Sequence, residues 1–84
     1  MRLYDFDLVF TEPVTDEEIA ERLFEVFDAA GATITPALIA GRSLLSVHIE
    51  GETLEAAIDR AVALARTAGA HPVGVELEVE SAAA

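Results

Sequence analysis

Two stretches, one near each end of the chain, alternate between apolar side chains and others. The first holds Tyr4, Phe6, Leu8 and Phe10, with Asp5, Asp7 and Val9 between them. The second holds Val73, Val75, Leu77 and Val79, with Gly74, Glu76, Glu78 and Glu80 between them. A period of two is typical of a strand with one buried face. Both stretches are therefore predicted strands whose apolar residues face the core and whose acidic residues face outward.

Two other stretches have helical spacing. The first begins at a capping-box sequence with Thr15 as the predicted N-cap and Glu18 as its partner, and its apolar residues are Ile19, Leu23, Phe24, Val26, Phe27 and Ala30. The second follows Thr53, also a predicted N-cap, and its apolar stripe is smaller: Leu54, Ala57, Ile58, Ala61, Val62 and Ala65. Gly31 and Gly69 stand where glycine commonly ends a helix.

The middle of the chain predicts a hairpin. Residues 32–40 are mostly apolar or β-branched but include Pro36, which predicts an edge strand or a strand broken near its middle. A predicted turn at Gly41 and Arg42 follows. In the next strand Leu45, Val47 and Ile49 alternate with Leu44, Ser46, His48 and Glu50.

The resulting order of elements predicts an α+β protein of the ferredoxin-like βαββαβ type. Its four-stranded antiparallel sheet would carry both helices on one face. The expected order of strands across the sheet is fourth, first, third, second. We predict that residues 1–80 form this single domain and that 81–84 form a disordered tail.

The opposite, open face of the predicted sheet gathers acids. Asp5 and Asp7 are expected near Glu76 and Glu78, with Glu80 beyond them, and His48 is expected on the same face. Like charges opposed across strands destabilise by up to about 1 kcal/mol for each pair, so something should compensate them. Three interpretations are open: a solvated face, a contact surface for a basic protein or a second copy, and a divalent cation site. Side chains on flat strands converge poorly on a cation.

Composition argues against several functions. Sixteen acids and five arginines give a net charge of −11, which disfavours binding to nucleic acid or to an anionic membrane. The aromatic residues occupy predicted core positions, which further disfavours RNA binding. The absence of cysteine excludes disulfides and thiolate metal sites. No apolar signal segment or membrane span is predicted, and a cytoplasmic location is the default expectation.

Catalytic motifs are not found in the sequence. It contains no glycine-rich phosphate loop, and its serines occupy no nucleophile context. His48 is the one residue of the open face that could act chemically, while His71 precedes Pro72 in a predicted turn. We therefore predict no enzyme and assign no catalytic, cofactor-binding or metal-binding residue.

The chain resembles small stand-alone ferredoxin-like proteins of bacteria, a group without an established function. Residues 4–10, the acidic helix after them, residues 54–58 and the closing Val-Glu strand carry the resemblance, which covers nearly the whole chain. It is also distantly similar to ACT-type modules, which bind amino acids between paired domains, commonly with a glycine-bearing loop after the first strand. The corresponding loop here, residues 11–15, has no glycine.

The leading functional hypothesis is a non-enzymatic protein-interaction or regulatory module, either a homodimer or a subunit of a larger bacterial assembly. The candidate partner-binding residues are Asp5, Asp7, His48, Glu76, Glu78 and Glu80. One alternative is an ACT-like module that senses a small molecule or a metal. Another is an acidic inhibitor that mimics nucleic acid, because carboxylates at alternate strand positions lie about 6.6–6.8 Å apart, close to the phosphate spacing of one strand.

Overall fold

The structure, a computed structural model, describes residues 2–77 and has the predicted order of elements. These are β1 (Arg2–Phe10), α1 (Glu17–Ala29), β2 (Thr33–Ile39), β3 (Arg42–Gly51), α2 (Leu54–Thr67) and β4 (Gly74–Leu77). The protein is therefore of the α+β class. Glu78, Val79 and Glu80, the end of the predicted last strand, lie outside the described residues, as does the predicted tail 81–84.

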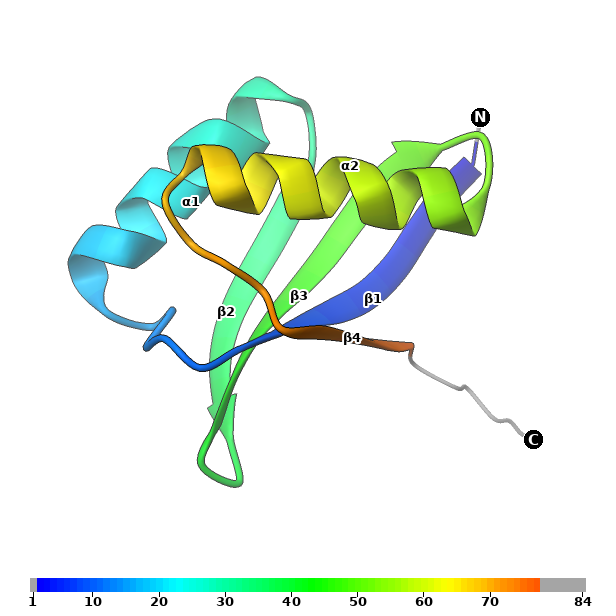
Figure 1. Ribbon diagram of the computed structural model, residues 1–84. Coiled ribbons are helices and arrows are strands. Elements are labelled where there is room, and N and C mark those ends of the chain that lie inside the picture. The colour runs from blue at the N-terminus through cyan, green and yellow to red at the C-terminus, as the bar shows by residue number, and fades with distance from the viewer. Residues whose placement is uncertain (1, 78–84) are drawn as a thin grey trace.

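The strands form one antiparallel sheet in the order β2-β3-β1-β4 (Figure 1). Read from β4, this order is fourth, first, third, second, as the sequence predicts. β2 lies at one edge and runs unbroken through Pro36. An edge strand tolerates proline because one side of it has no ladder to complete.

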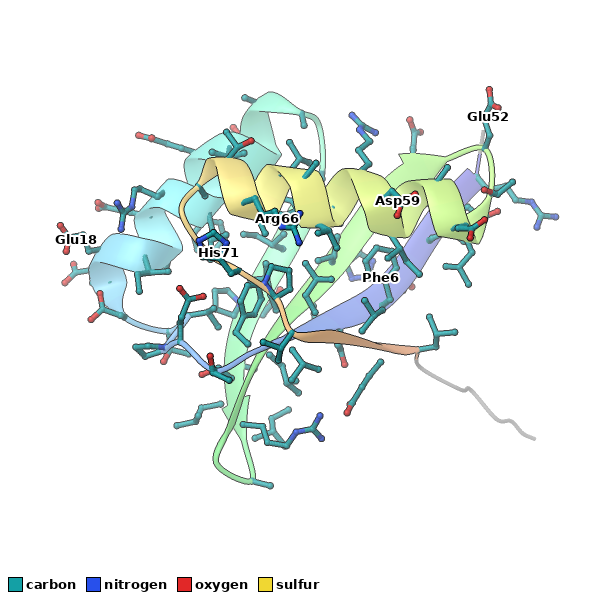
Figure 2. The ribbon with its side chains drawn as sticks, in the orientation of Figure 1. Phe6, Glu18, Glu52, Asp59, Arg66 and His71 are labelled. Carbon is teal, nitrogen blue, oxygen red and sulfur yellow. The ribbon has the colours of Figure 1, made fainter. Side chains whose placement is uncertain are left out.

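Both helices cover the same face of the sheet, and the core lies beneath them (Figure 1). Phe6 lies between α2 and the sheet, as Figure 2 shows. The largest fully buried side chains are Phe6, Phe27, Leu8, Leu23, Leu45, Ile49, Val14 and Val47. Burying each of these large side chains contributes roughly 1.5–3 kcal/mol. Within residues 2–77, no helix is both long enough and apolar enough to cross a membrane.

Phe24 is a wrong core prediction, since its side chain is 47% exposed. Leu23 and Phe27 are four residues apart, lie on one side of α1, and are both fully buried. Phe24 belongs to the margin of this stripe. The buried side of α1 is therefore narrower than its apolar pattern suggests.

The helix ends follow the predicted chemistry, with one shift at the start of α1. The N-cap is Asp16 rather than Thr15, and its carboxylate accepts a hydrogen bond from the Glu18 backbone N–H at 3.0 Å. Thr53 caps α2 as predicted, accepting from the Ala56 N–H at 3.1 Å. Either residue type can accept this bond, so the sequence alone does not decide between neighbouring caps.

Gly31 ends α1 in the left-handed conformation that its position predicts, with φ of +79°. Its N–H donates to the Asp28 carbonyl at 3.0 Å, and the Ala32 N–H donates to the Phe27 carbonyl at 2.9 Å. This pair of bonds is the Schellman motif. Gly69, with φ of +91°, ends α2 in the same way.

Helix α2 lies very close to the end of β3. Its sheet-facing residues Ala57, Ala61 and Ala65 are fully buried. A Cβ atom added to Gly51 would come within 2.9 Å of the Ala57 Cβ and 3.0 Å of its backbone nitrogen. The small side chains of α2 and the absence of a side chain at Gly51 together allow the helix to approach β3 this closely.

Arg60, an exposed residue of α2, holds the helix in this position. Its guanidinium donates to the Glu50 carbonyl at 3.2 Å and to the Ala30 carbonyl at 3.0 Å. It thus links α2 to the end of β3 and to the end of α1. Backbone carbonyls at helix ends lack a partner within the helix, and a charged donor satisfies them well.

We expect Gly51→Ala to destabilise the protein by about 1–3 kcal/mol, because the added methyl group overpacks the contact with Ala57. Urea denaturation followed by circular dichroism measures the change. Gly74→Ala is the matched control, since its Cβ would meet only the Val9 Cβ, at 4.0 Å. Equal stability of the two variants would contradict the close approach of α2.

The β2–β3 turn gives a second prediction. Its central residues are Ala40 and Gly41, one position earlier than predicted, with φ of 53° and 77°. Alanine is disfavoured there by roughly 1–2 kcal/mol, whereas asparagine tolerates this conformation. Ala40→Asn should therefore raise the free energy of unfolding by up to about 1 kcal/mol. Gly41→Ala should lower it, and a loss of stability in Ala40→Asn would count against this turn geometry.

Candidate functional site

The face of the sheet opposite the helices, here called the open face, brings together four of the predicted site residues. Asp5 and Asp7 alternate along β1 with the buried Phe6 and Leu8, so their side chains lie on the open face. His48 lies opposite Asp5, and Glu76 lies opposite Asp7. The other two predicted residues, Glu78 and Glu80, lie outside the described residues.

Asp5 and His48 form an ion-pair contact between β1 and β3. The Asp5 Oδ1 atom lies against the His48 Nδ1 atom, and the two side chains are 56% and 45% exposed. The Asp5 carboxylate thus orients the His48 ring, as expected from the position of His48 in the sequence. Among the described residues, none forms a hydrogen bond with the other ring nitrogen, Nε2.

Asp7 has a neutral partner. The Ser46 hydroxyl donates to the Asp7 Oδ1 atom at 2.9 Å, and the contact is partly buried. Ser46 is the residue paired with Asp7 across β1 and β3. A hydroxyl orients the carboxylate but does not neutralise it, so the negative charge of Asp7 remains beside that of Glu76.

Glu76 is compensated by Arg42, for which the sequence pattern predicts only a position in a turn. The two form an ion pair between the start of β3 and the middle of β4. Their side chains remain 49% and 45% exposed. Arg42 has the same parity as Ser46 and His48 on β3, so extending the alternation two residues further back would have placed it on the open face.

An apolar row crosses the same face next to these polar contacts. The strand register aligns Gly74, Val9, Leu44 and Ala37 across β4, β1, β3 and β2. Leu44 is only 6% exposed although no helix covers it. The register places Val9 between the backbone positions of Arg42 and Glu76, so the side chains of that ion pair cross this row. Ile39 borders the row beside the turn and is 57% exposed.

His71 does not belong to the open face. It lies in the loop between α2 and β4, where its backbone N–H donates to the Glu12 Oε1 atom at 2.9 Å. This bond joins the loop after α2 to the loop after β1. The two histidines lie on different elements, as predicted.

The open face is a flat polar and apolar surface. Among residues 2–77 no pocket is detected, and no group of three or more His, Asp or Glu side chains is placed to hold a metal ion. The arrangement is a set of cross-strand contacts, Asp5–His48, Asp7–Ser46 and Glu76–Arg42, beside an apolar row. Its available chemistry is charge, hydrogen bonding and surface complementarity.

No family model, curated protein or solved structure gives a significant match to the chain.

The Arg42–Glu76 pair predicts an asymmetric response to neutralisation. Arg42→Gln leaves Glu76 opposite Asp7 without a cation, whereas Glu76→Gln removes the ion pair and the repulsion together. We expect Arg42→Gln to be the more destabilising variant. A double-mutant cycle by urea denaturation should give a coupling of about 0.2–1 kcal/mol, because the pair is exposed.

Added salt supplies the control for this cycle. The coupling between Arg42 and Glu76 should shrink as ionic strength rises, since exposed charges are screened over about 10 Å at 0.1 M salt. Zero coupling at low salt, or equal losses in the two single variants, would show that this ion pair does not compensate the face.

Proposed function

We propose that the chain is a non-enzymatic protein-interaction module whose open face is a contact surface. The observation that carries the proposal is the ordered set of half-exposed charged contacts beside the apolar row that runs from Val9 to Ala37. Interfaces combine well-packed apolar groups with a polar surround that fixes orientation. A flat sheet face with both kinds of group suits a protein partner better than a small ligand, which binds in a concave site.

The charge of the face favours a basic partner. Asp5, Asp7, Glu50 and Glu76 carry negative charge on the open face, and Arg42 is its one arginine among the described residues. The Asp5 and Glu76 side chains are about half exposed, so their oxygens remain accessible to a second cation. Such charges would steer the partner and set its register more than they would add affinity.

The ferredoxin-like fold forms part of the same proposal. The order β4-β1-β3-β2, the antiparallel pairing and the two helices on one face support that assignment. In that fold the proposed contact surface is the face of the sheet that has no helices. The fold by itself indicates no particular partner.

A pair of matched variants tests the proposed surface. Asp5→Asn with Glu76→Gln removes two charges from the open face, while Glu21→Gln with Glu25→Gln removes two exposed charges from α1. Proteins retained by the wild-type chain from a lysate of its source would be identified, purified and titrated against all three forms. We expect a basic partner whose affinity falls by up to about tenfold in the open-face variant alone.

The salt dependence of binding provides a further check, since raising the ionic strength should weaken binding to the wild-type chain more than to the open-face variant. Denaturation of each variant controls for changes in folding. Equal losses in both variants would assign the effect to net charge, and the open face would then have no special role.

A further inference from the structure

The edge of the sheet formed by β4 carries an apolar strip on the helix side. Val75 and Leu77 of β4 are 36% and 52% exposed, and Val73, which directly precedes β4, is 65% exposed. Val75 and Leu77 pair with Leu8 and Phe6 on β1, which are only 0% and 2% exposed. The helix side of the sheet is therefore buried at β1 but exposed at the neighbouring strand, β4.

The packing of the helices explains this loss. α1 packs on β2, and α2 packs on β3 and β1, so the helix layer ends before β4 (Figure 1). Natural edge strands are usually protected by their shortness, by charged side chains such as lysine, by proline, by a bulge or by a covering element. β4 is short and carries one charge, Glu76, on the open face, but on its helix side Val75 and Leu77 are uncharged and lie beyond the helices.

We propose that a second copy of the chain pairs with this edge, β4 against β4 and antiparallel, about a two-fold axis at Val75. In this register Val75 lies opposite the partner's Val75, and Leu77 lies opposite the partner's Val73. Each exposed apolar side chain of the strip thus meets another one. Glu76 lies opposite the partner's Gly74, which has no side chain.

Glu76 and Pro72 select this register from its neighbours. A two-fold axis normal to the sheet pairs residues whose side chains lie on the same face, so the axis must pass through a residue and not between two residues. Moving the axis to Glu76 places two like charges directly opposite each other, which destabilises. Moving it to Gly74 places Glu76 opposite the partner's Pro72, which has no N–H for a ladder.

The pairing would also join the two open faces. The sheets of the two copies would become continuous through β4, and each Glu76–Arg42 ion pair would lie beside the two-fold axis. This inference does not depend on the proposed partner of the open face, because it uses the strand edge and the helix side of β4. Either proposal can fail without the other.

Light scattering after size-exclusion chromatography tests the pairing. The wild-type chain should show twice its monomer mass of 8.9 kDa. Val75→Lys places two cations at the axis and should return the mass to that of the monomer. Leu38→Lys is the matched control, because Leu38 is 62% exposed at the opposite edge of the sheet, and it should remain dimeric. A monomeric wild type, or a dimeric Val75→Lys, would overturn the proposal.

Cysteine cross-linking gives a second readout if Val75→Lys does not fold. The chain has no cysteine, so Val75→Cys introduces a single thiol. Directly paired residues have Cβ atoms about 4.5–5.5 Å apart, close enough for oxidation to join them with small shifts. Mild oxidation should convert Val75→Cys to a covalent dimer many times faster than Leu38→Cys. Similar rates for the two variants would contradict the predicted axis.

Discussion

The close contact of α2 with the sheet is the constraint on which the rest of the structure depends. Ala57, Ala61 and Ala65 are fully buried, and Gly51 has no room for a side chain. Because alanine buries little area, the helix contributes by proximity and shape more than by apolar surface. Arg60 then holds the same helix to the carbonyls of Glu50 and Ala30. One helix thus fixes the end of β3, the end of α1 and the side of the sheet that becomes the core.

The acidic composition of the open face follows from which side of the sheet the helices cover. Once Phe6, Leu8, Leu45 and Val47 face the helices, the alternate positions of the same strands must face away from them. Several of these positions are acidic, and Asp7 and Glu76 lie directly opposite each other. Each of these carboxylates has a partner across the strands: Arg42 forms an ion pair with Glu76, His48 contacts Asp5, and the Ser46 hydroxyl orients Asp7. The face is therefore an organised polar surface rather than an uncompensated row of carboxylates.

Much of this arrangement could be predicted from the sequence, because alternation and helical spacing reflect which side of an element is buried. The element order, the strand order, the Thr53 cap and the shared face of Asp5, Asp7, His48 and Glu76 were predictable in this way. Other features depend on the precise geometry of pairing. The Ala40-Gly41 turn is shifted by one position, and Phe24 lies just outside the buried stripe of α1. Arg42 finds Glu76 across an intervening strand, a contact between residues that are 34 positions apart in sequence.

The narrow helix layer links the core to the surface of the molecule. A stripe of alanines lets α2 approach β3 closely, but short side chains do not reach sideways over the neighbouring strands. Leu8 on β1 is fully buried, whereas Val75, its neighbour on β4, is 36% exposed. Larger residues on α2 would cover β4 better, but they would lift the helix away from Gly51 and remove the contact that closes the core. An exposed apolar edge is thus the physical consequence of how this small domain packs, and a second copy that pairs along β4 would complete its burial.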